Sequence, residues 1–270
     1  MNNTKAVFKP PPDLKISEWA DSHRRLSPEN SAEAGQWNTT RAEYQREIMD
    51  TFNDPLIERI VVMTSSQVGK TELVLNAIAY YMDQDASPML LLQPTLEMAQ
   101  TFSKDRLAPM CRDTPAITNK VADSKSRSSG NTMLHKSFPG GHITMAGANS
   151  PASLASRPIR ILLADEIDRY PVSAGAEGDP VNLAKKRTTT FWNRKIVLVS
   201  TPTIKDISRI EAAYADSTQE RYCIKCPSCG DYQQIRRENL QHTYKDDELK
   251  VIEAHCKHCG AVHSETEWKT

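Results

Sequence analysis

The stretch IVVMTSSQVGKT, residues 60–71, joins an aliphatic run to a polar turn that ends in Gly69-Lys70-Thr71. An apolar periodic segment follows, so the order is strand, loop and helix, which is the context of a phosphate-binding loop. The pattern G-x-x-x-x-G-K-[ST] is matched except at its first position, where Thr64 replaces glycine. This departure keeps an alternative open, in which a Gly-Lys-Thr tripeptide begins a helix and binds no ligand.

The chemistry of such a loop assigns a task to each of its residues. Backbone N–H groups and the positive end of the following helix cradle the phosphates of a nucleotide such as ATP. We predict that Gln67, Val68 and Gly69 form this cradle, where Gly69 permits a close approach of the backbone. Lys70 is expected to reach the β- and γ-phosphates, and Thr71 is expected to hold Mg²⁺.

A second motif follows another aliphatic run further along the chain. Residues 161–164 are aliphatic and lead into Asp165-Glu166-Ile167-Asp168. Catalytic groups of open α/β sheets gather at the C-terminal ends of the strands. We predict that Asp165 holds the hydration shell of Mg²⁺ and that Glu166 is the catalytic base that orients and polarises the attacking water. An acidic pair after a strand is otherwise a solvated turn or a helix start. Its position downstream of a phosphate-binding loop favours an ATPase.

From about residue 44, short aliphatic runs alternate with longer amphipathic segments, and this pattern predicts the fold class. Buried strands are expected at 60–63, 89–92, 143–146, 159–164 and 195–200, and helices at 70–82, 95–110 and 180–190. The polar stretch 122–141 suits a loop or a short hairpin. Strands that alternate with helices predict a mostly parallel sheet flanked by helices. Together with the two motifs, this is the α/β fold of a P-loop NTPase of the ASCE type.

Two further segments are candidates for contacts with the nucleotide. The amide of Gln45 could read the adenine edge by pairing donor with acceptor, although a surface glutamine is the alternative. Ser200 and Thr201 end the strand 195–200, where their hydroxyls could sense the γ-phosphate and couple its loss to other parts of the protein. An ordinary exit from the strand is the competing interpretation.

Cations are expected beside the transferred phosphate and on any DNA-binding surface. Phosphoryl transfer needs a cation against the developing charge, and residues 64–71 contain no arginine. Arg157 and Arg160 precede the acidic strand, and we predict that Arg157 is the catalytic finger, in the same or a neighbouring subunit. Surface solvation is the alternative for both. Lys185-Lys186-Arg187 is a candidate for contacts with DNA phosphates, although a short charge run is usually a solvated face.

Two C-x-x-C-G turns near the end of the chain predict a metal site. Cys226 and Cys229 form the first turn, and Cys256 and Cys259 form the second. Four thiolates aimed at one point make a closed tetrahedral zinc site, whose role is structural because no coordination position is open. We predict that Zn²⁺ stabilises a zinc-ribbon module at 219–270. Cys223 or a nearby histidine could replace one ligand, and unliganded cysteines are the alternative.

Composition and the N-terminal segment complete the domain assignment. The chain has 270 residues, and its 34 basic and 34 acidic side chains cancel, so any DNA contact must come from local patches. Residues 1–43 are expected to form an arm, and 44–218 are expected to form the P-loop domain. No apolar run is long enough for a membrane span, and the N-terminus lacks the apolar core of a signal peptide, so a reducing cytoplasm is expected.

With these residues in hand, the chain resembles the large terminase subunit of tailed bacteriophages, specifically the GpA-like family. The likeness covers nearly all of the chain, and several of its motifs are far more specific than a P-loop. These motifs are residues 44–50 (YQREIMD), 66–71 (SQVGKT), 130–132 (GNT), 135–141 (HKSFPGG), 147–151 (GANSP), 154–158 (LASRP), 165–171 (DEIDRYP), 186–191 (KRTTTF) and 200–203 (STPT).

The resemblance implies an ATP-hydrolysing motor that docks as a homo-oligomeric ring on the portal protein of a procapsid. It would drive double-stranded DNA inward in the host cytoplasm, together with a small terminase subunit that recognises the viral DNA. With the cysteine motif, the expected cofactors are ATP, Mg²⁺ and structural Zn²⁺. Family members also carry a C-terminal metal-dependent nuclease. Since the sequence stops just after the zinc module, no DNA cleavage is expected of these 270 residues.

Two other functions stay open from the sequence. Asp165-Glu166-Ile167-Asp168 also fits the D-E-x-D box of a helicase-like translocase, which would separate the strands of a forked substrate. A zinc-stabilised DNA-binding or scaffold protein with an inactive nucleotide site is the other alternative, because Thr64 departs from the loop pattern. Hydrolysis of ATP in the presence of DNA separates a motor from such a scaffold.

Overall fold

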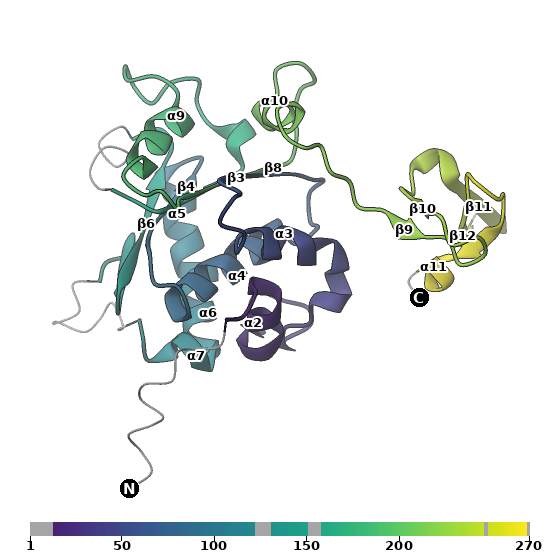
Figure 1. Ribbon diagram of the computed structural model, residues 1–270, viewed down its shortest axis with the longest axis horizontal. Helices are drawn as coiled ribbons and strands as arrows, with labels where there is room; N and C mark the ends of the chain where they lie inside the picture. The colour runs from purple at the N-terminus through teal and green to yellow at the C-terminus, as the bar shows by residue number, and fades with distance from the viewer. Residues whose placement is uncertain (1–12, 122–130, 151–157, 246–247, 269–270) are drawn as a thin grey trace, which may run out of the picture. The chain divides into compact units, whose positions relative to one another are not determined.

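The chain folds as two units, residues 1–217 and 218–270, in a computed structural model (Figure 1). The structure describes residues 13–121, 131–150, 158–245 and 248–268, and the side chains among them except those of 244–251. No helix in these ranges is long and apolar enough to cross a membrane.

A six-stranded sheet forms the centre of the first unit (Figure 1). In spatial order its strands are β3 (Arg59–Met63), β8 (Lys195–Ser200), β7 (Ile161–Asp165), β4 (Pro88–Gln93), β6 (Gly141–Gly147) and β5 (His135–Phe138). The first five strands are parallel, and β5 pairs antiparallel with β6 at one edge. The predicted mostly parallel α/β sheet is therefore confirmed, and the described part of 122–141 supplies an edge strand.

The strand order brings the two sequence motifs to one edge of the sheet. β8 lies between β3, which leads into the phosphate-binding loop, and β7, which ends in the acidic pair. Met63 pairs with Ser200, and Asp165 pairs with Val199, so the C-terminal ends of the three strands are level. An additional strand between the phosphate-binding strand and the acidic strand is the arrangement of the ASCE type of P-loop fold.

Alternate side chains of the parallel strands face two different apolar clusters. In β4, Met89 and Leu91 belong to one cluster, whereas Leu90 and Leu92 belong to the other. Because helices cover both faces, these strands are continuous apolar runs rather than alternating ones. The strands were predicted from these continuous apolar runs.

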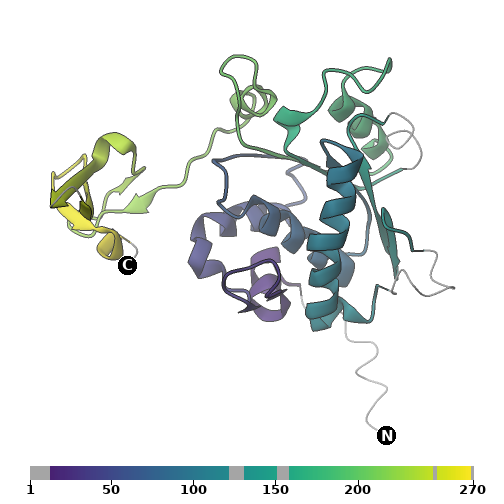
Figure 2. The same cartoon turned by 180° about the vertical axis from the view of Figure 1, so that it is seen from behind.

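The larger cluster is covered by α4 (Lys70–Asp83), most of whose side chains are buried. The predicted helix 95–110 begins at Leu96 with Thr95 as its N-cap, and runs through α5 (Leu96–Phe102), a π-helical turn at Ser103–Leu107 and α6 (Ala108–Asp113). These turns form one column across the sheet in Figure 2. Pro109 lacks an N–H group and cannot continue the regular hydrogen-bond ladder, which accounts for an irregular turn at this point. The short helix α7 (Pro115–Thr118) follows.

Residues 13–43 contribute buried side chains to the same cluster. Trp19, in α2 (Ile16–His23), is fully buried, and its Nε1 donates to Asp83 Oδ2 at 2.7 Å, at the end of α4. Trp37 is also buried and follows the hairpin of β1 (Arg25–Leu26) and β2 (Gly35–Gln36). Burying such a side chain contributes about 1.5–3 kcal/mol, so this segment helps to stabilise the unit. The 3-10 stretch η1 (Thr39–Gln45) and α3 (Arg46–Thr51) connect it to β3.

The smaller cluster is covered by shorter elements. They are η3 (Ile167–Arg169), α9 (Pro180–Lys185), the 3-10 turn η4 (Lys186–Thr188) and α10 (Arg209–Ala215). The predicted helix 180–190 is thus shorter than expected. Thr188 Oγ1 donates to Lys185 O at 2.8 Å and Thr189 Oγ1 donates to Lys186 O at 3.0 Å, so threonine hydroxyls take carbonyls that a longer helix would use.

The second unit is small and has little apolar core. Its elements are β9 (Ile224–Lys225), β10 (Tyr232–Gln233), η5 (Arg237–Asn239), β11 (Leu240–Lys245), β12 (Glu248–His255), β13 (Val262–Ser264) and α11 (Glu265–Trp268). The buried cluster in its described part consists of Cys226, Ala254, Cys256 and Trp268. Two of these four residues are cysteines, so apolar burial contributes little to the stability of this unit.

Candidate functional site

The phosphate-binding loop has a backbone suited to an anion. Gln67 (φ 60°) and Gly69 (φ 79°) are left-handed, and they are the positive-φ positions within 64–71, all of which is described. Alternation in the sign of φ turns successive N–H groups toward one point, which is how backbone nests bind phosphate. Thr64 has no positive φ, so the backbone there does not require the glycine of the usual pattern.

Gln45 lies directly behind this loop. Its Nε2 donates to Val68 O at 3.0 Å, and Tyr44 Oη donates to the same carbonyl at 2.9 Å. A Cβ added to Gly69 would lie 2.5 Å from Gln45 Nε2, so only glycine fits there without displacing the amide. Gln45 is 3% exposed, and its Oε1 has no hydrogen-bond partner among the described residues. It is therefore not the surface glutamine that the sequence left open.

Lys70 connects the loop to the other two strands. It is buried, and its Nζ donates to Ser65 O at 2.9 Å and to Thr201 Oγ1 at 2.5 Å. Glu166 Oε1 lies 3.6 Å from the same nitrogen. The ammonium group therefore makes two hydrogen bonds and one ion pair. The structure thus brings together Lys70, Glu166 and Thr201, which come from three separate sequence motifs.

Asp165 is the last residue of β7 and is 5% exposed. Gln93 Nε2, at the end of the neighbouring strand β4, donates to Asp165 Oδ2 at 3.0 Å. Burial raises the pKa of Asp165 to about 6, and the Gln93 hydrogen bond opposes this rise while the nearby charge of Glu166 adds to it. The carboxylate is costly to bury with its charge, and a cation beside it would stabilise the charged form.

Glu166 follows in a left-handed conformation, with φ 55° and ψ 48°. This conformation is strained for a residue with a Cβ, and such strain is concentrated at functional sites. It turns the carboxylate toward Lys70 on one side, while Arg169 Nε lies 3.8 Å from Glu166 Oε2 on the other. Arg169 is 64% exposed and is a cation close to the acidic pair.

The end of β8 is held to both neighbouring strands. Thr64 N donates to Ser200 O at 3.3 Å, and Asp168 N donates to Ser200 Oγ at 3.2 Å. Ser200 is fully buried, whereas Thr201 is only partly buried and reaches Lys70. Ser200 and Thr201 therefore touch the phosphate-binding loop on one side and the acidic turn on the other.

The residues at this edge fit a magnesium-bound nucleoside triphosphate. Thr71 lies in the first turn of α4 beside Lys70, and a hydroxyl and a carboxylate such as Asp165 are oxygen ligands of the type that Mg²⁺ takes. The unpartnered Oε1 of Gln45 and the second hydrogen of its amide form a donor–acceptor pair, which is what the adenine edge matches. The unpartnered, buried Oε1 of Gln45 is thus an observation that a nucleotide base would account for.

Other predicted site residues lie away from this edge or outside the described ranges. Arg157 falls outside the described residues. Arg160 precedes β7, and its guanidinium is bound by Asp85 at 2.7 Å and 2.6 Å, so it is engaged at the opposite edge of the sheet. The basic run Lys185-Lys186-Arg187 also lies toward that edge, since Ile159 N donates to Arg187 O at 3.0 Å.

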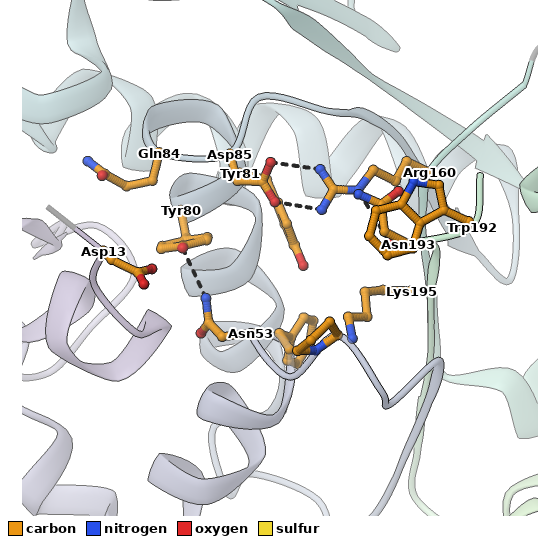
Figure 3. Close-up of a pocket in the computed structure, with 12 residues that line it drawn as sticks. Asp13, Asn53, Tyr80, Tyr81, Gln84, Asp85, Arg160, Trp192, Asn193 and Lys195 are labelled. Atoms are coloured by element: carbon orange, nitrogen blue, oxygen red, sulfur yellow. Dashed lines mark hydrogen bonds and ion pairs between the residues drawn. The ribbon is translucent and has the colours of Figure 1, made fainter. Parts of the chain in front are cut away.

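A cavity of about 440 Å³ opens at this opposite edge (Figure 3). Tyr80 and Tyr81, near the end of α4, line it together with Arg160, Trp192 and Lys195 from the starts of β7 and β8. The phosphate-binding loop lies at the other end of the same helix and strands. The cavity is therefore distinct from the edge of the sheet that carries Lys70 and Glu166, despite its size.

The second unit contains the predicted cysteine cluster. The Sγ atoms of Cys226, Cys229, Cys256 and Cys259 lie within 4.8 Å of one another. The Cys226–Cys259 distance is 3.9 Å and the Cys229–Cys256 distance is 3.8 Å. Zinc–sulfur bonds of about 2.3 Å in a tetrahedron place the sulfurs about 3.8 Å apart, so the four thiols fit Zn²⁺. Cys223 is exposed and is not part of the cluster.

Three polar residues beside this edge of the sheet were assigned no separate role from the sequence, although Asp168 and Arg169 lie in the motif 165–171. Gln93, Asp168 and Arg169 each contact a predicted site residue or its neighbours. Gln93 had a usable signal, since it is a polar residue that ends a buried apolar run. Arg169 had only its proximity in sequence to the acidic pair, and the role of Asp168 depends on contacts with residues far along the chain.

The fold and the site together define a class, an α/β P-loop NTPase of the ASCE type. The chain belongs to a family within it, since the model of the phage terminase large subunit gpA, ATPase domain, matches residues 31–270. The resemblance found in the motifs is confirmed.

Two curated relatives are terminase large subunits of phages. The one from Enterobacteria phage P21 is 29% identical over 228 residues, which is 84% of this chain and 35% of that protein. The one from Escherichia phage lambda is 26% identical over 234 residues, or 86% and 36% of the two chains. The chain thus spans about a third of the length of these relatives.

Among solved structures, a mutant of the large terminase ATPase domain of Thermus phage P74-26 aligns with a TM-score of 0.48 and 16% identity. The alignment covers 70% of this chain and 75% of that one. This likeness is too weak to inform the site.

Proposed function

We propose that this chain is the ATP-hydrolysing part of a DNA-packaging motor, which uses ATP and Mg²⁺ to drive double-stranded DNA into a procapsid. The observation that carries the proposal is the convergence on Lys70. A buried ammonium group lies 3.6 Å from Glu166 Oε1 and 2.5 Å from Thr201 Oγ1, beside a loop built to hold phosphate. Membership of the terminase family supports DNA as the cargo of the motor.

Each residue at this edge has a task in the proposed reaction. The ammonium group of Lys70 replaces its two protein acceptors, Ser65 O and Thr201 Oγ1, with phosphate oxygens. Its charge then stabilises the phosphates, and the backbone does not have to move. Glu166 accepts a proton from the attacking water. Gln45 positions the adenine from behind the loop.

A metal ion and additional cations would balance the negative charges of the triphosphate and of Asp165. Thr71 and Asp165 would hold Mg²⁺, which neutralises charge that develops on the transferred phosphate. A bound cation would also keep Asp165 ionised despite the burial that raises its pKa. Arg157 stays our candidate for a finger from the same or a neighbouring subunit, and Arg169 is a second cation within the same chain.

The remaining partners of the proposed motor follow from its family. We propose that it works in the host cytoplasm as a ring on the portal protein, with a small terminase subunit, and that Lys185, Lys186 and Arg187 contact DNA phosphates. In the second unit, Zn²⁺ held by the four cysteines supplies the stability that the small apolar core does not. The nuclease that family members carry is not assigned to this chain.

The proposal is tested with Glu166→Gln. This change keeps the shape of the side chain and removes the base, so we expect ATP hydrolysis in the presence of Mg²⁺ and DNA to fall by about 10²–10⁴-fold while nucleotide binding persists. The exposed Glu177→Gln is a matched control, expected to hydrolyse at the wild-type rate. A Glu166→Gln protein that hydrolyses as fast as wild type would contradict the role of Glu166. Strand separation on a forked duplex would instead indicate a helicase.

A further inference from the structure

Asp168, the last acid of Asp165-Glu166-Ile167-Asp168, accepts hydrogen bonds from other parts of the chain at both carboxylate oxygens. Its Oδ2 accepts from Thr203 N at 2.9 Å and from Thr203 Oγ1 at 3.0 Å, and its Oδ1 accepts from Ile210 N at 2.8 Å. Burial would raise the pKa of Asp168, but hydrogen bonds from Ser208, Ile210 and Thr203 lower it below the usual value. The carboxylate is therefore charged at neutral pH and is held by protein donors at both oxygens.

These donors come from both ends of one loop. Thr203 begins the stretch 203–208 and Ile210 follows it, in the first turn of α10. Between the two ends, Ile204 and Ile207 are 65% and 75% exposed, so the loop has little apolar packing of its own. Its internal hydrogen bonds are local, such as that from Ser208 N to Ile204 O at 2.9 Å. Asp168 thus fixes both ends of an exposed loop to the turn that carries Glu166.

The same loop starts two residues after Thr201, which binds Lys70. Lys70 Nζ now donates to Thr201 Oγ1 at 2.5 Å, and an incoming phosphate would compete for that hydrogen. The environment of Thr201 must therefore differ between the nucleotide-bound and nucleotide-free proteins. A differential interaction of this kind is what allows a ligand to shift the position of a distant segment.

We propose that Asp168 is a positioning residue that makes loop 203–208 respond to the nucleotide. Asp168 ties Thr203 and the start of α10 to the acidic turn. A change at Lys70 and Thr201 therefore displaces the whole loop 203–208, and the movement is not confined to residues 201–203. This inference rests on the proposed function, because it requires that a nucleotide binds at Lys70.

The test is hydrogen exchange of the backbone amides of Thr203 and Ile210, with and without a non-hydrolysable ATP analogue and Mg²⁺. In the wild type we expect the analogue to change the exchange of both amides by at least about threefold. In Asp168→Asn we expect both amides to exchange about tenfold faster and to lose the response, because hydrogen bonds to a charged acceptor are replaced by weaker ones. Affinity for the analogue should stay within about threefold of the wild-type value, since the Asp168 carboxylate bonds to Thr203 and Ile210 and not to Lys70, Thr71 or Glu166.

Asp206→Asn is the matched control in the same loop, because the Asp206 carboxylate has no hydrogen-bond or ion-pair partner in the described part of the chain. It should respond like the wild type. If Asp168→Asn fails to fold, the Thr203→Val variant is used for the same test. It removes one of the donors to Asp168 and should weaken the response by about half.

Three results would overturn the inference, and they are distinguishable. If Asp168→Asn, or Thr203→Val in its place, responds as the wild type does, Asp168 does not position the loop. If the wild type binds the analogue but neither amide responds, the loop does not report the nucleotide, and the proposed ATPase survives. If the wild type does not bind the analogue at all, the proposed function fails and this inference fails with it.

Discussion

Substitution of Gly69 by alanine tests the contact between the phosphate-binding loop and Gln45. At φ 79°, a Cβ in the left-handed region costs about 1–2 kcal/mol. The added Cβ would also lie 2.5 Å from Gln45 Nε2, so the amide must move and its 3.0 Å hydrogen bond to Val68 O is lost, which costs about 1 kcal/mol more. We therefore expect Gly69→Ala to lower the free energy of unfolding by about 2–3 kcal/mol, measured by urea denaturation.

A control and a double variant separate the two contributions. Gly178 also has a positive φ, 98°, but a Cβ there would meet nothing within 4 Å, so Gly178→Ala should cost only the backbone part, about 1–2 kcal/mol. In a Gln45→Ala background, Gly69→Ala should cost about 1 kcal/mol less than in the wild type, because the clashing amide is absent. If Gly69→Ala costs no more than Gly178→Ala, and the Gln45→Ala background changes nothing, the packing of Gln45 behind the loop is refuted.

Two further predictions concern charge and metal. Because burial raises the pKa of Asp165 to about 6, above the unfolded value of about 3.9, the charged form destabilises the metal-free fold as the pH rises through this window. The free energy of unfolding of Asp165→Asn, relative to that of the wild type, should therefore increase by about 2 kcal/mol from pH 4.5 to pH 7 in urea denaturation. If this difference in free energy is the same at both pH values, the result argues against a buried carboxyl. The purified protein should contain about one Zn²⁺ per chain, and chelation or Cys256→Ser should unfold residues 218–270 and expose Trp268. Metal-free protein with Trp268 still buried would eliminate the zinc site.

Much of the edge that carries Lys70 and the acidic pair could be predicted from the sequence because its signals are local. A polar turn before an amphipathic helix and an acidic pair after an apolar run each lie within about ten residues, and the parallel sheet brings the strand ends to one edge. The fold class followed from the same runs, since strands buried on both faces lack alternation.

Contacts between distant residues could not be predicted in the same way. The hydrogen bonds of Asp168 to Thr203 and Ile210, and that of Gln93 to Asp165, depend on which strands become neighbours, and the sequence does not state the strand order. Arg160 was considered for catalysis because it is close in sequence to the acidic strand. Its place at the start of that strand puts it at the opposite edge, where Asp85 binds it. The hydrogen bond of Trp19 to Asp83 could not be predicted either, because Asp83 lies far along the chain.

The measurement that tests the central claim most directly is the affinity of the protein for a non-hydrolysable ATP analogue with Mg²⁺, in the wild type and in Lys70→Ala. Lys70 is expected to make charge-assisted hydrogen bonds to phosphate, so its loss should weaken binding by at least about 100-fold. Lys104→Ala, at an exposed lysine, is the matched control and should bind as the wild type does. An affinity of Lys70→Ala within about threefold of the wild-type value, in a variant that remains folded, would contradict a triphosphate held between Lys70 and the acidic pair.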